Sequence, residues 1–359
     1  MANMSPKKNP IPEQDPNVRN KNFEEVALGY TVEMAVDEAN RCLNCPRPAC
    51  MSGCPVNVKI PQFIARVREQ DFKGAYHKIL EDSSLPAICG RVCPQEKQCE
   101  SKCVRGIKGE PVGIGRLERF VADWNRENAD EMPEKIATNG HRVAVIGSGP
   151  AGLTCAYYLA LKGYPVTVFE KEKELGGMLT LGIPSFRLEK DVIRAEIDIL
   201  RDLGVQFKTG VAVGTDITLD ALRAEGFKAF YLAVGASRGA KLRCPGEELP
   251  GVMTGIDFLR AVNLGEAPAI GTSVVVIGGG NVAIDVARAA VRLGAEVTVV
   301  YRRDRDSMPA ADDEIAEAAE EGVSFRFLAS PAEILGDGRA ETLKIELMEL
   351  RGGKPAGTG

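Results

Sequence analysis

Apolar residues recur three or four positions apart in two stretches of the first third of the chain, 60–67 and 75–80. This spacing lines one face of an α-helix, so it predicts two amphipathic helices. Thr31 is a typical helix N-cap, and an earlier helix is expected to run from it toward Cys42. A further helix is expected over RLERFVADWNRE. A hairpin of the two amphipathic helices would bring the segments on either side of it together.

The pattern changes at His141. The stretch RVAVIGSGPAGLTCAYYLALKGYPVTVFEK has the order strand, glycine turn, helix, strand. The same order returns at Ser273 in SVVVIGGGNVAIDVARAAVRLGAEVTVVYRR. Each stretch predicts a dinucleotide-binding βαβ unit. The predicted fold is therefore multidomain, with an N-terminal α-helical domain followed by two α/β Rossmann-like domains.

Domain boundaries follow from these changes of pattern. We expect an extended polar tail over 1–30, a helical cysteine-rich domain over 31–128, a polar linker over 129–140, a first nucleotide-binding domain over 141–268 and a second over 269–359. The second nucleotide-binding domain is short for its type, so it is expected to be incomplete and the chain is expected to be truncated at its C-terminal end.

Charge and hydropathy exclude several classes of function. The net charge of −5 and the pI of about 5.5 argue against a nucleic-acid-binding surface. The sequence has no long uncharged apolar stretch and no apolar core near its start, so neither a membrane span nor a signal peptide is predicted. We therefore expect a cytoplasmic protein. With only two histidines, a histidine-based zinc site is disfavoured.

Eight of the ten cysteines lie in two blocks, CLNCPRPACMSGCP and CGRVCPQEKQCESKC. Cytoplasmic thiols stay reduced, so disulfides are not expected, whereas short cysteine spacings with one distant ligand are typical of 4Fe–4S clusters. The spacing predicts one cluster on Cys42, Cys45, Cys50 and Cys103. It predicts a second cluster on Cys54, Cys93 and Cys99, with Cys89 as the simplest fourth ligand.

The alternative is a pair of tetrahedral zinc sites, which also use sets of four cysteines. That alternative would make the chain a zinc-stapled nucleotide-binding regulatory protein. Nucleotide-binding units downstream favour iron–sulfur clusters, because a redox chain needs a one-electron carrier and zinc is not one. The two remaining cysteines, Cys155 and Cys244, are interpreted as packing and loop residues.

The first glycine turn predicts an FAD site. Gly147 permits the tight turn, Gly149 lets the backbone approach a pyrophosphate, and Gly152 lets the helix pack close to the strand. Glu170 ends the next strand, where a carboxylate suits the ribose hydroxyls. The phosphates would face the positive end of the helix.

The second glycine turn predicts a site for NADPH. Its residues are Gly278, Gly280, Asn281 and Ala283. Arg302 and Arg303 end the following strand, where the first unit has its glutamate. Guanidinium groups at that place suit the 2′-phosphate of NADPH, although a solvated charge run is the alternative interpretation. Two such sites predict hydride transfer between cofactors, which requires no catalytic side chain.

Seven motifs together resemble the small (beta) subunit of NADPH-dependent glutamate synthase. They are NFEEVALGYT, ANRCLNC, CGRVCPQ, IGRLERF, IGSGPAGL, LGGMLTLGIPSFRL and GGGNVAIDVARAA. The sequence is also similar to the large subunit of NADH-dependent reduced ferredoxin:NADP oxidoreductase and to the N-terminal half of dihydropyrimidine dehydrogenase. The resemblance runs from about residue 20 to the end and implies two 4Fe–4S clusters, FAD and NADPH. In this family the chain returns after the NADPH domain to finish the FAD domain, so the resemblance implies that the FAD domain is incomplete here.

The resemblance also implies residue roles. Some relatives replace one cysteine of the second cluster by an oxygen ligand, and the matching residue here is Glu118. The implied second set is then Cys54, Cys93, Cys99 and Glu118, with Cys89 as the alternative to Glu118. Residues implied near the flavin are Gly176, Gly177, Met178, Gly182, Ile183 and Pro184.

The expected function is transfer of electrons from NADPH through FAD and the clusters to a partner. The resemblance implies a large glutamate synthase subunit as partner, with glutamate formed from glutamine and 2-oxoglutarate. The alternative is the FAD subunit of a ferredoxin-linked NADH/NADP transhydrogenase, with a ferredoxin-reductase-like subunit as partner.

Overall fold

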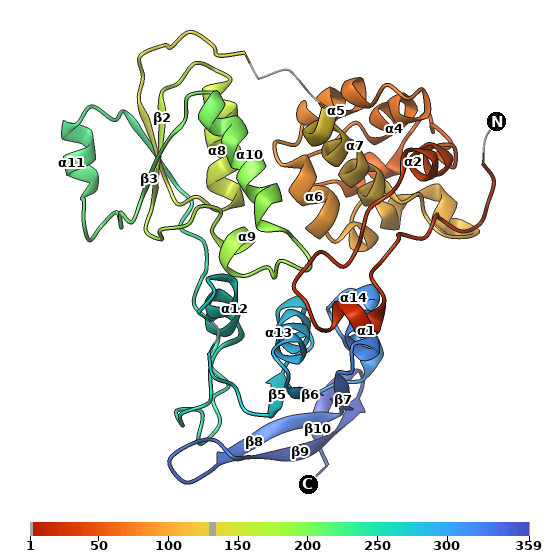
Figure 1. The fold of residues 1–359 in the computed structure, drawn as a ribbon, viewed down its shortest axis with the longest axis vertical. Coiled ribbons are helices and arrows are strands. Elements are labelled where there is room, and N and C mark those ends of the chain that lie inside the picture. Colours follow the sequence, from red (N-terminus) through yellow and green to blue (C-terminus); the bar gives the residue numbers. More distant parts are fainter. Residues whose placement is uncertain (1–2, 129–133, 267, 359) are drawn as a thin grey trace. The chain divides into compact units, whose positions relative to one another are not determined.

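The computed structural model describes residues 3–128, 134–266 and 268–358, so the first part of the expected linker lies outside the described residues. The chain forms two compact units. Unit 1 comprises Met1–Glu13, Glu25–Thr180 and Arg187–Gly235, and unit 2 comprises Gln14–Glu24, Leu181–Phe186 and Ala236–Gly359. The chain therefore passes between the units several times (Figure 1).

The first half of unit 1 is helical, as the apolar spacing predicts. Its helices are α2 (Val32–Ala39), α3 (Ala49–Gly53), α4 (Ile60–Arg68), α5 (Phe72–Leu80), α6 (Pro86–Val92) and α7 (Ile114–Asn128), with 3-10 turns η1 (Gln95–Lys97), η2 (Glu100–Lys102) and η3 (Val104–Ile107). Thr31 caps α2 by accepting a hydrogen bond from the N–H of Met34 at 3.3 Å. The apolar faces of α4, α5 and α7 meet in one core, where Phe63, Ile79 and Leu117 are fully buried (Figure 1). Among the described residues, no helix is long and apolar enough to cross a membrane.

A buried ion pair fixes the geometry of the first cysteine block. Arg41 and Glu38 are both fully buried, and their side chains meet at 2.6 Å. Arg41 also donates to the carbonyl oxygens of Glu110 at 2.7 Å and Pro111 at 3.0 Å. Because Arg41 precedes Cys42, these bonds hold the first cysteine block next to the segment that follows Cys103.

The second half of unit 1 is the first nucleotide-binding fold. Parallel strands lie in the order β3-β2-β1-β4, which are β3 (Gln206–Thr209), β2 (Val166–Glu170), β1 (Val143–Ile146) and β4 (Ala229–Leu232). The helices are α8 (Pro150–Ala160), α9 (Met178–Leu181), α10 (Lys190–Asp202) and α11 (Leu219–Ala224). Every residue of β1 and β2 is buried, as expected of central parallel strands. The expected order of strand, turn, helix and strand is confirmed.

Unit 2 repeats this order. Strands β5 (Ser273–Ile277), β6 (Glu296–Tyr301) and β7 (Ser324–Phe327) are parallel, and the helices are α12 (Gly255–Asn263), α13 (Asn281–Arg292) and α14 (Asp312–Glu320), with the 3-10 turn η4 (Arg305–Ser307). An antiparallel sheet follows, built from β8 (Ala329–Leu335), β9 (Thr342–Arg351) and β10 (Lys354–Gly357). This second sheet was not among the elements expected from the sequence.

The N-terminal segment differs from the extended tail expected over 1–30. Residues Pro16–Arg19 form the short helix α1, because Pro16 suits the first helical position and Asp15 accepts from the N–H of Asn17 at 2.9 Å. Figure 1 shows α1 in red beside α14 in blue. Arg19 is buried, and its guanidinium pairs with Glu320 at 2.7 Å and Glu321 at 3.1 Å.

Glu321 is the centre of a buried charge cluster in unit 2. It accepts from Arg288 at 2.7 Å and from Arg292 at 2.6 Å, and all three side chains are fully buried. Burial raises the pKa of the Glu321 carboxyl, but hydrogen bonds from Arg292 and Arg288 outweigh that effect and hold it below its ordinary value. The Arg292 guanidinium also lies 4.0 Å above the ring of Phe186.

We predict that Glu321→Ala destabilises the protein by roughly 3–5 kcal/mol, because it leaves buried guanidinium groups without their shared carboxylate. Urea unfolding followed by circular dichroism measures this loss. Because the pKa of Glu321 is lowered on folding, its stabilisation is present at neutral pH and is lost as the pH falls through that lowered pKa.

The matched control is Glu320→Ala. The Glu320 side chain pairs with the same Arg19 but is 56% exposed. We expect its loss to cost at most about 1 kcal/mol. Equal effects of the two substitutions would contradict the central role of Glu321.

Candidate functional site

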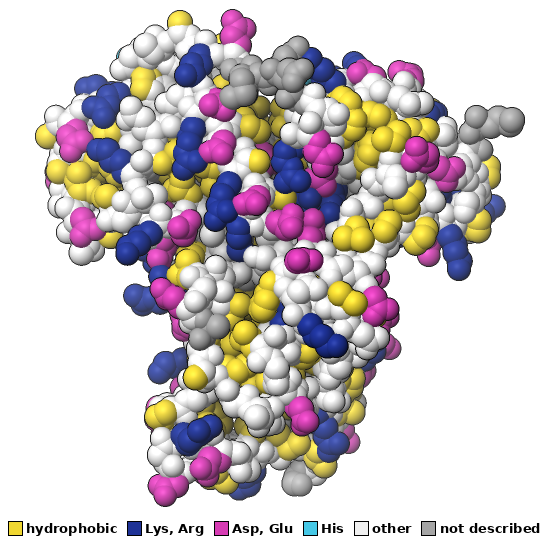
Figure 2. Space-filling view, viewed as in Figure 1, with side chains coloured by type: hydrophobic (Ala, Val, Ile, Leu, Met, Phe, Trp, Pro, Cys, Tyr) yellow, Lys and Arg dark blue, Asp and Glu magenta, His cyan; other side chains and the backbone are white. Residues whose placement is uncertain are grey.

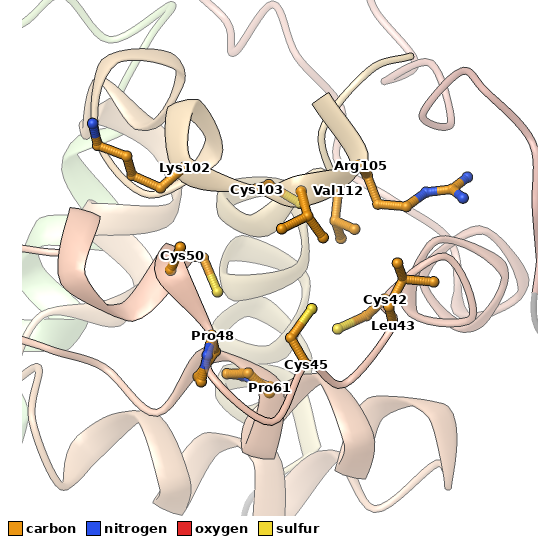
Figure 3. A pocket seen from close by; sticks show the side chains of 12 residues that line it. Cys42, Leu43, Cys45, Pro48, Cys50, Pro61, Lys102, Cys103, Arg105 and Val112 are labelled. Atoms are coloured by element: carbon orange, nitrogen blue, oxygen red, sulfur yellow. The ribbon is translucent and has the colours of Figure 1, made fainter. Parts of the chain in front are cut away.

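Four thiols of the first cysteine set line one pocket. Cys42 and Cys45 lie in the loop between α2 and α3, Cys50 lies in α3, and Cys103 follows η2; their side chains surround a shared space (Figure 3). Most other lining groups near the thiols are apolar, among them Pro61 and Val112. A small apolar space walled by four thiols fits a 4Fe–4S cluster, whose four irons each take one thiolate.

The charges of these thiols depend on one another. Burial raises the pKa of Cys50 to about 11, and the neighbouring Cys103 and Cys42 raise it further. Burial likewise raises the pKa of Cys42. Metal ions bind thiolates and not thiols. Binding of metal in this pocket would therefore release the protons of the thiols, and the metal ions would take the place of those protons on the sulfur atoms.

The second cysteine set lies where α3, α6, η2 and α7 approach one another. Burial raises the pKa of Cys99 well above its ordinary value, and Glu100, Glu118 and Cys54 add to that shift. Glu118 on α7 is half-buried, and its pKa is also raised well above the ordinary value, first by burial and then by Cys89 and Glu196. Carboxyl and thiol groups therefore gather at this place.

Cys89 and Glu118 both adjoin this second set. A hydrogen bond with Cys93 is the largest cause that raises the pKa of Cys89, and Ser83 Oγ lies 3.8 Å from its sulfur atom. Since both candidates for the fourth ligand lie here, the choice between them stays a prediction. Among the described residues, no three His, Cys, Asp or Glu side chains are close enough to enclose a single metal ion.

Glu196 is a buried carboxylate that the sequence analysis missed. It lies on α10 of the nucleotide-binding fold, and it accepts a hydrogen bond at 2.8 Å from the N–H of Ala87 on α6. Burial raises its pKa to about 7. The signal was present in the sequence, because Glu196 occupies the same helical face as Ile193, Ile197 and Leu200.

The first glycine turn has the predicted geometry. Gly147 has φ of +105°, and a Cβ there would lie 2.3 Å from the carbonyl oxygen of Ala233. A Cβ on Gly152 would lie 2.0 Å from the carbonyl oxygen of Gly147. At Gly149 a Cβ would meet no described atom within 4 Å, so the backbone before α8 faces open space. That arrangement fits a pyrophosphate at the start of α8.

Glu170 is held rigidly beside this turn. One carboxylate oxygen accepts from the backbone N–H of Ser148 at 2.8 Å and from its hydroxyl at 2.6 Å. The other accepts from the N–H of Glu172 at 3.0 Å. The Ser148 hydroxyl in turn accepts from the N–H of Gly176 at 3.1 Å. The free lone pairs of this fixed carboxylate suit ribose hydroxyls.

The residues implied near the flavin fall in both units. Gly176 and Gly177 have positive φ, and a Cβ on Gly177 would lie 2.8 Å from Cα of Gly149. Met178 begins α9 in the same unit. The segment 182–184 belongs to unit 2, and its approach to a flavin stays a prediction.

The second glycine turn lies between β5 and α13. Gly278 has φ of +136°, and a Cβ there would touch Ala283 at 3.4 Å. The amide oxygen of Asn281 accepts from the N–H of Ala311 at 3.2 Å. Gly279, which the sequence analysis passed over, also has a reason to be glycine, because a Cβ there would lie 2.7 Å from the ring of Tyr301.

Two arginines follow β6 as predicted. Arg302 is exposed, and Arg303 is half-buried. Within the described residues, Nε of Arg303 is buried and has no hydrogen-bond partner. An unpaired guanidinium N–H at the end of this strand fits a phosphate oxygen. Arg305 differs, because it pairs with Asp312 at 3.6 Å on the surface.

Two family models match the chain. Residues 19–130 match the model described as dihydropyrimidine dehydrogenase domain II, 4Fe-4S cluster. Residues 141–354, more than half of the chain, match the model described as pyridine nucleotide-disulphide oxidoreductase. The boundary between the two matches coincides with the change of pattern at His141.

Several curated proteins are similar over most of the chain. The glutamate synthase (NADPH) small chain of Halomonas elongata is 38% identical over 97% of this chain and 76% of that protein. Subunit PreT of the NAD-dependent dihydropyrimidine dehydrogenase of Escherichia coli is 39% identical over 88% and 76%. The NADPH-Fe(3+) oxidoreductase subunit beta of Geobacter sulfurreducens is 38% identical, but the chain spans 51% of its length.

A solved structure has the same fold. FprA of Mycobacterium tuberculosis in complex with NADPH aligns with a TM-score of 0.52 and 22% sequence identity, over 61% of this chain and 66% of that one. At this identity the likeness concerns the fold, and it agrees with the two nucleotide-binding folds described above.

We predict that Cys50→Ser removes one cluster, because it deletes a thiol from the first pocket. Cys89→Ser is expected to keep both clusters if Glu118 is the fourth ligand of the second. Iron and acid-labile sulfide counts on anaerobically purified variants measure this difference. Loss of a cluster in Cys89→Ser would overturn the Glu118 assignment.

We also predict that Arg302→Glu weakens NADPH about tenfold or more while leaving NADH nearly unchanged, since a charge-assisted hydrogen bond is worth roughly 1.5–3 kcal/mol. Calorimetric titration with each nucleotide measures the two affinities. Arg305→Glu is the matched control and should leave the preference intact. If Arg302→Glu kept the wild-type preference for NADPH over NADH, the alternative would be supported, in which the arginines only form part of a run of charged residues exposed to solvent.

Proposed function

Because the chain belongs to the family of the glutamate synthase (NADPH) small chains, we propose that it delivers electrons from NADPH to a partner subunit that forms glutamate. The observation that carries this proposal is the similarity to the Halomonas elongata small chain over 97% of this chain and 76% of that protein. The chain itself is an NADPH-dependent flavin and iron–sulfur oxidoreductase.

The family defines the cofactors as NADPH, FAD and 4Fe–4S clusters, which decides against the zinc interpretation. When bound, FAD accepts a hydride from NADPH and returns the electrons singly, and 4Fe–4S clusters carry single electrons. No side chain has to donate or remove a proton in this chemistry. The chain therefore contributes binding, orientation and exclusion of water.

The FAD site in this proposal uses the first glycine turn. The N–H groups at the start of α8 bind the pyrophosphate, and Glu170, held by Ser148, binds a ribose. Gly177 keeps the backbone close to Gly149, where a side chain would obstruct the dinucleotide. Gly147, Gly152, Gly176 and Met178 of the same unit are also assigned to this site.

The NADPH site in this proposal uses the second glycine turn. Gly278, Gly280 and Ala283 let the start of α13 approach the phosphates, while Asn281 fixes the loop at Ala311. The 2′-phosphate is bound by Arg302 and Arg303. The buried unpaired Nε of Arg303 supports that role.

The clusters are assigned to the two thiol sets. The first is held by Cys42, Cys45, Cys50 and Cys103, whose pocket Figure 3 shows. The second is held by Cys54, Cys93, Cys99 and Glu118, with Cys89 as the alternative to Glu118. Apolar neighbours such as Pro61 and Val112 exclude water from the first pocket.

The proposed partner is the large subunit of a glutamate synthase. The net reaction converts glutamine, 2-oxoglutarate, NADPH and a proton into two glutamates and NADP⁺, so the hydride supplied here accounts for both electrons that the second glutamate requires. Binding of glutamine and 2-oxoglutarate then belongs to the partner. The chain supplies reducing equivalents alone.

Anaerobically purified protein tests the proposal. We expect absorption near 400 nm, about eight irons per chain, and NADPH-dependent formation of two glutamates per NADPH when a purified large subunit, glutamine and 2-oxoglutarate are added. A colourless protein without sulfide would overturn the electron-transfer function. NADPH oxidation that occurs only with an NADH-linked partner and yields no glutamate would favour the transhydrogenase alternative.

A further inference from the structure

The ring of Tyr301 packs on the second glycine turn. Tyr301 is the last residue of β6 and is half-buried. A Cβ on Gly279 would lie 2.7 Å from its ring, which is closer than real Cβ atoms come to a neighbour, so the ring and the glycine backbone are in contact. The end of β6 is thereby fixed against the turn that, in the proposed function, binds the pyrophosphate of NADPH.

The hydroxyl of the same side chain holds the loop that follows β6. It donates to the carbonyl oxygen of Ser307 at 2.8 Å. Asp304 strengthens this loop, because its carboxylate accepts from the N–H of Ser307 at 3.0 Å. We name residues 302–307 the arginine loop, since they include both arginines assigned to the 2′-phosphate. The loop is closed by the bond between Tyr301, which precedes it, and its last residue.

Further hydrogen bonds fix the backbone on both sides of the arginine loop. The N–H of Leu328 donates to the carbonyl oxygen of Arg303 at 3.1 Å. After the loop the chain returns to the glycine turn, where the N–H of Ala310 donates to the carbonyl oxygen of Gly279 at 3.1 Å. Tyr301 differs from these contacts, because it touches the turn with its ring and the loop with its hydroxyl. It therefore links the two places directly.

The chain as a whole offers no general attraction for an additional phosphate. Its net charge is −5, and basic and acidic side chains are interspersed on the face seen in Figure 2. Binding of a 2′-phosphate therefore depends on guanidinium groups that are held at the right place. Arg303 is half-buried, and within the described residues its buried Nε has no partner, so the position of the loop backbone determines where that N–H lies.

We propose that Tyr301 is a positioning residue that sets the preference for NADPH over NADH, because it holds the arginine loop at a fixed place relative to the glycine turn. This inference rests on the proposed function and adds the residue that joins the two parts of its nucleotide site. The pyrophosphate and the 2′-phosphate belong to one nucleotide, so the groups that bind them must keep a matching separation. A loop that already has this arrangement loses less conformational freedom when the nucleotide binds.

The two nucleotides separate this role from a merely structural one. NADH has the same pyrophosphate but no 2′-phosphate, so it gains nothing from an ordered arginine loop. Loosening of the loop should therefore weaken NADPH and leave NADH nearly unchanged. A side chain that only stabilised the fold would affect both nucleotides equally, because both use the same glycine turn.

The test is calorimetric titration of the full-length holoprotein with NADP⁺ and with NAD⁺, which cannot transfer a hydride to the flavin during the measurement. Tyr301→Phe removes the hydroxyl and keeps the ring on Gly279. We expect this variant to bind NADP⁺ roughly three- to tenfold more weakly, the effect of one lost hydrogen bond, and NAD⁺ with less than about a twofold change. Tyr301→Leu, which also removes the ring, should reduce the preference further.

The matched control is Tyr30→Phe. The Tyr30 hydroxyl also donates to a backbone carbonyl oxygen, that of Asn9 at 2.6 Å, but both residues belong to unit 1. Its two affinities should equal those of the wild type. The proposal is overturned if Tyr301→Phe keeps the wild-type affinities, if it weakens both nucleotides by the same factor, or if the wild type does not prefer NADP⁺. The first two outcomes leave the proposed function intact, whereas the third also contradicts its NADPH site.

Discussion

The buried pair of Glu38 and Arg41 is the interaction on which the first thiol pocket depends. A fully buried guanidinium needs partners for its donors, and Arg41 binds Glu38 and the carbonyl oxygens of Ser5, Glu110 and Pro111. These contacts join two segments that are about seventy residues apart in sequence. The hydrogen bonds of Arg41 therefore hold the segment of Cys42 next to the segment that follows Cys103, and both cysteines line the same pocket.

A second buried carboxylate links the helical region to the nucleotide-binding fold of the same unit. Glu196 of α10 accepts from the backbone of α6, and α6 ends next to Cys93. Ser84 and Thr154 add a hydroxyl pair at 3.0 Å between the same two regions. The segment that positions the second cysteine set is thus attached to the helices that cover the flavin fold. These hydrogen bonds limit movement between the two regions of unit 1.

The sequence predicted the features that local pattern determines. Both βαβ units, the cap at Thr31 and the helical hairpin follow from spacing and from residues a few positions apart. The grouping of Cys42, Cys45, Cys50 and Cys103 followed from cluster chemistry. What could not be predicted depends on distant partners, since the burial of Arg19 needs Glu321. The β9–β10 hairpin did have a local signal, because Gly352 and Gly353 form its two-residue turn and both have positive φ. Cys89 and Glu118 remained alternatives because both adjoin the same place.

The membership of Gln14–Glu24 in unit 2 has a consequence for biosynthesis. Arg19 leaves the ribosome 302 residues before Glu321, its buried partner. Until then, the segment Gln14–Glu24 lacks these native contacts, while the cysteine-rich helices that follow it in the chain can already form. Folding of unit 2 therefore requires Arg19 to meet Glu321. A contact between residues so far apart in sequence forms slowly compared with a helix. Metal loading of the helical region can accordingly precede completion of the domain that supplies its electrons.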